Sequence, residues 1–246
     1  GDPAICMGGW GTYCHGGEGG LARGLTDEYQ VLCIDYRGIG DSTDDLSVEP
    51  TMALHAEDVI GLLDHLGWQN VHFVGLVGMG ACIAQEVAIR RPELVRSMVN
   101  MGAWAKVDEF LGDQLEVFRD VHKDCGFFTF QKHVCTMSFL PEFYIANRHR
   151  LLGPDGPWHE LNGRYQAHER LVGACLSHDA LDRLGQIKAP SLIIHAGKDT
   201  VTSPRYTLPL EHGIPNAEGV LMENVAITGV TDLSAFFCYG GNDMLI

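Results

Sequence analysis

The chain has 246 residues, of which 46% are hydrophobic, and its 17 Lys and Arg against 32 Asp and Glu give a net charge of −15. This size suits one large domain with its own core, and a charged fraction of only 20% excludes a disordered or coiled-coil chain. The acidic balance argues against nucleic acid or an anionic membrane as partner, because both attract clustered Lys and Arg. No apolar run reaches the roughly 18 residues that cross a bilayer and no signal peptide is evident, so we expect a cytoplasmic protein.

Short apolar runs alternate with helical patterns along most of the chain. The runs are typical of buried strands and cover 4–7, 30–35, 71–75, 95–101, 192–196 and 218–222. Helical spacing predicts helices over 52–66 and 79–91, a short helix within 19–28, and a last helix that begins at Thr231. Unbroken apolar strands separated by helices predict a doubly wound, mostly parallel α/β sheet.

The alternation stops between Trp104 and His178, in a stretch rich in aromatic residues and histidines. We expect a mostly helical insertion, because the sheet pattern resumes after it. The expected division is a core formed by 1–103 and 179–246, with 104–178 as a helical cap. The aromatic residues of the insertion either form its own small core or line an apolar ligand cavity.

The cysteines and histidines show no metal-binding spacing. The eight cysteines include no CxxC pair, and the 12 histidines include no HExxH or HxH pattern. We therefore expect reduced thiols, no metal site and no cofactor.

Three segments resemble the α/β-hydrolase fold family. Residues 35–42 (DYRGIGDS) are similar to its D-x-R-G-x-G-x-S turn, and residues 74–92 are similar to its nucleophile turn with the flanking strand and helix. Residues 183–199 resemble the segment that delivers the acid of a catalytic triad. The resemblance covers nearly the whole chain, is closest to the lactonase, esterase and carbon–carbon hydrolase branch, and implies a helical cap at the insertion.

Two of the three reactive groups that this fold normally uses are predicted to be absent. The nucleophile stands in a G-x-nucleophile-x-G turn, and alignment through residues 84–86 places Gly78 there, or Val77 if the register shifts by one. Neither side chain can attack a carbonyl. Ile227 stands where the resemblance implies the histidine, and no histidine follows His212, which lies before the sixth strand.

The acid and the oxyanion donors are expected to remain. Asp199 stands at the acid position, where it is a remnant, a substrate contact or a capping residue. The resemblance implies oxyanion donors at the backbone N–H groups of Met79 and Trp10, which do not depend on a serine side chain. The alternative is that the glycines of residues 8–11 only form a tight turn.

Further residues are candidates for lining a pocket. Tyr13 and His15 follow the glycine loop and could line a pocket entrance, with His15 as a general base or as a solvated loop histidine. The candidates from the insertion are Trp104, Phe128, Phe139, Trp158 and His168.

One departure from the family concerns the start of the chain. Residues 1–3 resemble the turn before the family's third strand, so its first two strands are not in the sequence. We expect an uncovered sheet edge beside strand 30–35. Either the chain is a trimmed form, or a second copy covers the edge in a homodimer.

Three functions compete on these observations, all with a small-molecule partner. The first is an enzyme that acts on a small apolar carbonyl compound without a covalent serine step, by a lyase, cyclisation or hydration reaction. The second is a pseudoenzyme that binds a ligand or a partner without turnover. The third is an esterase or lactonase whose triad lies elsewhere in the sequence.

Overall fold

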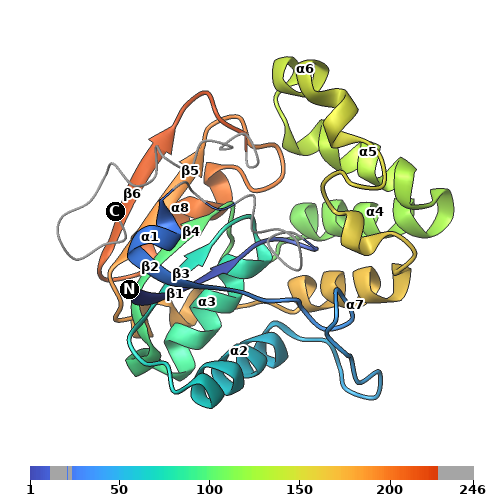
Figure 1. Cartoon of the computed structure of the whole chain (residues 1–246). Helices are drawn as coiled ribbons and strands as arrows, with labels where there is room; N and C mark the ends of the chain where they lie inside the picture. Colours follow the sequence, from blue (N-terminus) through green and yellow to red (C-terminus); the bar gives the residue numbers. More distant parts are fainter. Residues whose placement is uncertain (12–20, 22–23, 227–246) are drawn as a thin grey trace.

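The computed structural model describes residues 1–11, 21 and 24–226. A six-stranded sheet lies at its centre, with every pair of neighbours parallel and the order β2-β1-β3-β4-β5-β6 (Figure 1). The strands are β1 (Asp2–Met7), β2 (Tyr29–Cys33), β3 (Val71–Gly75), β4 (Val95–Met101), β5 (Ser191–Ala196) and β6 (Ala217–Met222). The predicted parallel α/β sheet is confirmed.

Helices connect most of the strands. They are α1 (Leu25–Glu28), α2 (Met52–Leu66), α3 (Met79–Arg90), α4 (Glu109–Cys125), α5 (Phe127–Ser138), α6 (Pro141–Leu151), α7 (Tyr165–Leu176) and α8 (Pro204–Gly213). Short 3₁₀ helices are η2 (Pro92–Leu94), η3 (His159–Leu161) and η4 (Leu181–Gln186). The helix predicted within 19–28 is the single turn α1 as far as it is described, and the helix predicted from Thr231 lies outside the described residues.

The boundaries of α2 follow from its sequence. Thr51 is the N-cap, and its hydroxyl accepts a hydrogen bond from the N–H of Leu54 at 3.1 Å. Gly67 ends the helix in the left-handed conformation, with φ 67°, where glycine has no steric cost. Between them, residues three and four apart are buried, so the helix presents one apolar face to the core.

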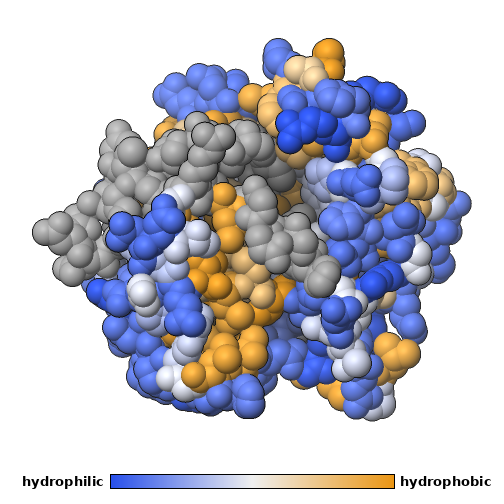
Figure 2. Space-filling model, viewed as in Figure 1, coloured by the Kyte–Doolittle hydropathy of each residue, from blue (hydrophilic) through white to orange (hydrophobic). Residues whose placement is uncertain are grey.

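The four central strands of the sheet, β1, β3, β4 and β5, are mostly buried on both faces, whereas the edge strands β2 and β6 are partly exposed. Alternate strand residues point to opposite sides, so Ile5 and Phe73 pack with α2 and α3, whereas Cys6 and Val74 pack on the other side with Leu25 of α1. Figure 2 shows that some hydrophobic residues remain visible on this face, in the lower middle of the molecule between hydrophilic margins. Strands that are apolar on both sides, as the sequence predicts, need elements packed on both faces of the sheet.

Helices α4 to α7 form the insertion between β4 and β5, and Figure 1 shows them gathered on one side of the sheet. Its two ends meet at an isolated bridge between Lys106 and Asp179, whose side chains form an ion pair at 2.6 Å. The N–H of Ala180 also donates to the carbonyl of Ala105 at 2.7 Å. The chain therefore leaves and re-enters the sheet at neighbouring points, which lets the insertion stand over the ends of the strands.

One edge of the sheet lies at β2, which pairs with β1 alone within the described part of the chain. Coverage of this edge by a second copy stays a prediction.

Among the described residues, no helix combines the length and the apolar character that crossing a membrane requires.

Candidate active site

The turn between β3 and α3 has an unusual backbone. Gly78 is the N-cap of α3 and has φ 68° and ψ −98°, and Val77 before it has φ 61°. A β-branched residue at positive φ is strained, whereas glycine adopts such values without a clash. Strain of this kind gathers at functional sites. The structure thus places Gly78 on a sharp strand-to-helix turn, the geometry in which the resemblance implies a nucleophile.

Two glycines let this turn approach its neighbours closely. A Cβ added at Gly80 would lie 2.2 Å from the carbonyl oxygen of Met7, and one at Gly75 would lie 2.4 Å from the Cα of Ala81. The N–H of Gly80 donates to the carbonyl of Gly8 at 3.0 Å. Helix α3 is therefore held directly against the loop that follows β1.

We expect Gly80→Ala to lower the free energy of unfolding by about 3 kcal/mol or more, because the methyl group meets backbone that cannot move away. Gly61→Ala is the matched control, since nothing lies within 4 Å of a Cβ there and alanine favours the helix. Urea denaturation of both variants measures the difference. Equal stability of the two variants would contradict the close approach at Gly80.

An apolar cavity of about 60 Å³ lies over this turn, large enough for a few water molecules or the reacting end of a small ligand. Loops after β1, β3, β4 and β5 form its floor, and the insertion forms its roof. The lining residues are Gly9, Trp10, Val77, Gly78, Met79, Trp104, Leu115, Phe118, Val134, Ser138, Trp158, Val201 and Thr202. Five of the predicted site residues meet here: Trp10, Gly78, Met79, Trp104 and Trp158.

Both predicted oxyanion positions border the same space. Met79 is the first residue of α3, so its N–H has no acceptor within the helix and carries part of the positive end of the helix dipole. Trp10 is held by its indole N–H, which donates to Sγ of Cys175 at 3.2 Å, and by an edge contact with Phe118 at 5.8 Å between ring centroids. Backbone donors fixed in this way can stabilise negative charge on a ligand oxygen.

Asp199 caps the turn that follows β5. Its carboxylate accepts hydrogen bonds from the N–H groups of Val201 and Thr202 at 2.8 and 2.9 Å, and from the Thr202 hydroxyl at 2.7 Å. Burial raises the pKa of the Asp199 carboxyl above its ordinary value, although these hydrogen bonds oppose the shift. Of the three roles weighed for Asp199, the geometry shows the capping one. Val201 and Thr202, rather than Asp199 itself, line the cavity.

His168 does not line the cavity and is part of the packing behind it. The side chain is fully buried, 5.0 Å from the ring of Trp10 and 4.6 Å from that of Phe130. Its Nδ1 lies 3.0 Å from Nδ1 of His122, so one of the two imidazoles donates to the other. Burial is the main reason that the pKa of His168 falls to about 3, which keeps it neutral.

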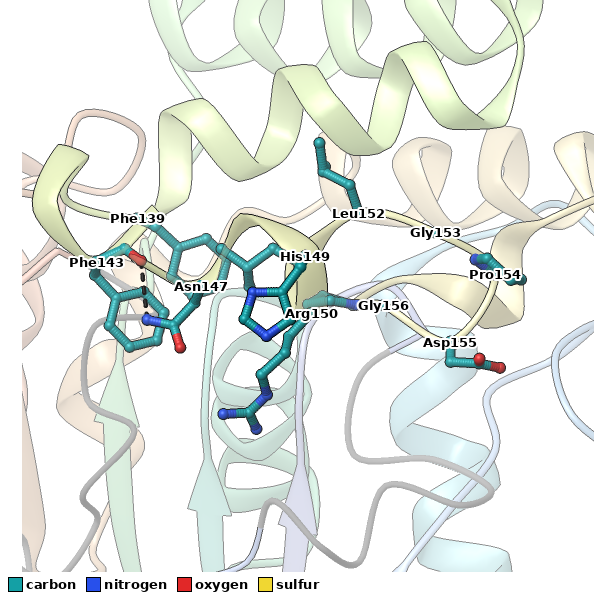
Figure 3. Close-up of a pocket in the computed structure, with 12 residues that line it drawn as sticks. Phe139, Phe143, Asn147, His149, Arg150, Leu152, Gly153, Pro154, Asp155 and Gly156 are labelled. Carbon is teal, nitrogen blue, oxygen red and sulfur yellow. Dashed lines mark hydrogen bonds between the residues drawn. The ribbon is translucent and has the colours of Figure 1, made fainter. Parts of the chain in front are cut away.

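The remaining predicted positions lie elsewhere. Phe128 was expected at a pocket but lies on the surface of α5 with 54% of its area exposed. It points away from the face of α5 that packs on the rest of the insertion. Phe139 lines a second pocket, which lies beside α6 and residues 152–157 (Figure 3). Tyr13, His15 and Ile227 lie outside the described residues. Among those that are described, no group of three or more His, Cys, Asp or Glu side chains is arranged to hold a metal ion.

The sequence analysis missed two hydroxyl groups of the cavity. Thr202 follows Asp199 by three residues, a spacing typical of a side chain that hydrogen-bonds a nearby turn, and this signal could have been found. Ser138 ends α5 and reaches the cavity only because the insertion folds over the sheet. No local pattern marks that contact.

Comparison with known proteins agrees with this architecture. The sequence model of the alpha/beta hydrolase fold family matches residues 5–226. The chain belongs to the α/β-hydrolase fold family. The resemblance drawn from the three sequence segments is thereby confirmed.

Relatives of this α/β-hydrolase fold protein carry hydrolase names. The chain is 26% identical over 201 residues to "Putative carbamate hydrolase RutD" of Agrobacterium fabrum, covering 81% of this chain and 76% of that one. It is 28% identical over 202 residues, with the same coverage, to the protein of that name from Pseudomonas savastanoi pv. phaseolicola.

Solved structures share the fold. The enol-lactonase from Burkholderia xenovorans LB400 aligns with a TM-score of 0.81 and 20% identity, over 96% of this chain and 88% of that one. MGS-M2, an alpha/beta hydrolase enzyme from a Medee basin deep-sea metagenome library, aligns with a TM-score of 0.82 and 23% identity, over 100% and 92%. At these identities the likeness shows the fold alone.

Proposed function

We propose that the protein binds a small apolar carbonyl compound in the cavity and processes it without a covalent serine step. One observation carries the proposal: Trp10 and Met79, the two predicted oxyanion positions, border the same cavity as Gly78, which has no side chain to attack with. The names of the relatives support the ligand class, because carbamates, lactones and esters all contain an acyl carbonyl.

The chemistry that such a cavity favours is polarisation of the carbonyl. Backbone N–H groups draw electron density towards the oxygen, and the apolar walls strengthen this interaction by excluding water. The bound compound then reacts with water or with one of its own groups, in a hydration, lyase or cyclisation step. No bond to the protein forms in any of these reactions.

Trp104 lines this wall, with the outer atoms of its six-membered ring nearest to position 78, and it also carries a buried donor. Its side chain is 3% exposed, and its indole N–H has no hydrogen-bond partner within the described part of the chain. A buried donor without an acceptor costs about 1–3 kcal/mol. The proposal assigns this missing acceptor to an oxygen of the bound carbonyl compound.

We expect the protein to convert at least one member of a panel of small lactones, enones and aromatic keto compounds, and Trp104→Phe to reduce kcat/KM for it by about tenfold. Phenylalanine keeps the ring but removes the N–H. Trp68→Phe, at a partly buried tryptophan after α2, is the matched control and should leave the rate unchanged. Product formation followed by chromatography measures both variants.

A fluorophosphonate probe separates the proposal from a conventional serine hydrolase. The probe labels an activated serine, so we expect no stoichiometric labelling. Stoichiometric labelling, mapped by peptide mass spectrometry to Ser138 or another serine, would contradict the proposal and favour an esterase or lactonase.

A second candidate function is ligand binding without turnover. It is favoured by Asp199, because the hydrogen bonds of its carboxylate hold the turn after β5 and leave it no evident task in proton transfer. Ligands that raise the melting temperature without forming any product would select this function over the first.

A further inference from the structure

Two hollow spaces meet at the insertion. We call the cavity over the turn between β3 and α3 the inner cavity, and the space of about 710 Å³ beside α6 and residues 152–157 the second pocket (Figure 3). Ser138 lines the inner cavity, whereas the next residue, Phe139, lines the second pocket. In the same way, Trp158 lines the inner cavity and Pro157 before it lines the second pocket. The rings of Phe139 and Trp158 meet edge to face with centroids 6.5 Å apart, so they form the boundary between the two spaces.

Two tryptophans of the cavity wall, Trp10 and Trp158, differ in what lies behind them. The indole N–H of Trp10 donates to Sγ of Cys175 at 3.2 Å, and its ring lies 5.0 Å from that of His168, so the packed interior lies behind Trp10. Behind Trp158 lies Phe139, which borders the second pocket. Loss of the Trp158 ring would therefore extend the inner cavity towards open space, whereas loss of the Trp10 ring would leave a hole in the core.

The backbone holds Trp158 in a conformation that its side chain disfavours. Its φ of 64° and ψ of 10° lie in the left-handed region, where every residue with a Cβ is strained. The fully buried amide of Gln131 donates to the carbonyl of Pro157, directly before Trp158, at 3.0 Å. The same amide donates to the carbonyl of Gly153 at 3.0 Å and accepts from its N–H at 2.9 Å. These hydrogen bonds fix the segment that carries the ring, and strain maintained in this way is typical of functional positions.

We propose that Trp158 is the specificity-determining residue of the proposed site, and that it restricts the substrate to carbonyl compounds with a short apolar chain. The inner cavity, of about 60 Å³, receives the carbonyl group and the first carbons, and a longer chain meets the buried indole ring of Trp158, which is 3% exposed. This inference rests on the proposed function and names the substrate class of the same site.

Isothermal titration calorimetry on the full chain with 2-butanone, 2-hexanone and 2-octanone tests the size limit. These ketones differ only in chain length and have no leaving group, so the measurement reports binding. For the unmodified chain we expect no gain in affinity from 2-hexanone to 2-octanone. For Trp158→Ala we expect a gain of about fourfold for each added CH₂, which corresponds to about 0.8 kcal/mol of apolar burial, because the space of the indole ring is then free.

Two further variants and a control complete the series. Trp158→Gly also removes the ring, and it relieves the strain of the positive φ, so it serves where Trp158→Ala does not fold. Trp158→Phe keeps a smaller ring and should show a smaller gain with chain length than Trp158→Ala. Trp68→Ala removes a partly buried tryptophan after α2, which does not line the inner cavity, and should keep the length dependence of the unmodified chain.

Three results would overturn the inference. They are the same gain with chain length in the unmodified chain as in Trp158→Ala, no gain in a folded Trp158→Gly variant, or no binding of any of the ketones at millimolar concentration. If small lactones or enones are still converted by the unmodified chain in those cases, the proposed function stands and only the size limit fails. If the length dependence changes as expected but the unmodified chain converts no carbonyl compound, Trp158 limits a binding site and the proposed reaction fails.

Discussion

A chain with both Gly78→Ser and Ile227→His is expected to hydrolyse p-nitrophenyl acetate at least about 100-fold faster than the unmodified chain, whereas either change alone leaves the rate at its baseline. A serine hydroxyl is a weak nucleophile until a base removes its proton, so the two groups act as a unit. The unmodified chain has neither group at the positions that the family resemblance implies.

The geometry at Gly78 is suited to the change. A Cβ there would lie 3.0 and 3.3 Å from the outer ring atoms of Trp104, so the new side chain points into the cavity and the ring must shift by a few tenths of an ångström. The positive φ of 68° is strained for serine, and this strain is a normal property of a nucleophile turn.

The control carries Gly78→Ala with Ile227→His, which introduces the same strain without a hydroxyl group. It should show neither hydrolysis nor fluorophosphonate labelling. Fast hydrolysis by the unmodified chain would contradict the predicted loss of the nucleophile. A folded double variant without any gain would show that position 78 or position 227 is not the triad position.

The second large effect expected is a loss of stability as the pH falls from about 6.5 to 4.5, with His168 as a main cause. An unfolded histidine titrates near 6.5, whereas burial and the nearby His122 and Arg119 lower the pKa of His168 to about 3. Burial also lowers the pKa of His55 and of His178 to about 4 each. The folded chain therefore favours the neutral form of all three imidazoles.

The sign follows from proton uptake. Because the folded-state pKa values lie below the unfolded value, the unfolded chain binds more protons as the pH falls, and acid therefore favours unfolding. The contribution of these histidines to the free energy of unfolding is fully present above about pH 6.5. It is lost progressively as the pH falls towards their pKa values in the folded chain. The three histidines together contribute several kcal/mol, roughly a large part of the free energy of unfolding of a typical domain.

Urea denaturation at pH 7.0, 5.5 and 4.5 measures this dependence above the range in which most carboxylates titrate. His168→Gln cannot take up a proton, so its free energy of unfolding should fall less steeply with acid than that of the unmodified chain. His65→Gln, at an exposed histidine near the end of α2, should leave the slope unchanged. Equal slopes for His168→Gln and the unmodified chain would contradict the role of His168.

The strands and the main helices could be predicted because their signals are local. The apolar runs at 71–75 and 95–101 coincide with β3 and β4, and the helix predicted over 52–66 coincides with α2. The run predicted at 30–35 is shifted, since β2 ends at Cys33. Hydrogen-bond pairing with β1, and not the apolar run itself, decides where that strand ends.

In the insertion, local sequence patterns do not predict which aromatic residues line a cavity. The sequence analysis chose Phe128 and Phe139 as pocket candidates and not Phe118, yet Phe118 lines the inner cavity, Phe139 lines the second pocket, and Phe128 faces solvent. Which of them meets a cavity depends on how α4, α5 and α6 pack on one another and on the sheet. That packing joins residues far apart in the chain, so periodicity cannot distinguish their roles.

The sequence by itself determined the class of fold, the order of its elements and the absence of a reactive side chain at Gly78, because each of these depends on residue type and spacing along the chain. Only the tertiary structure decided that Trp10 and Met79 border one cavity, that Asp199 caps a turn, and that His168 is buried behind Trp10. Those facts depend on distances between segments from separate strands and from the insertion. Folding alone sets these distances.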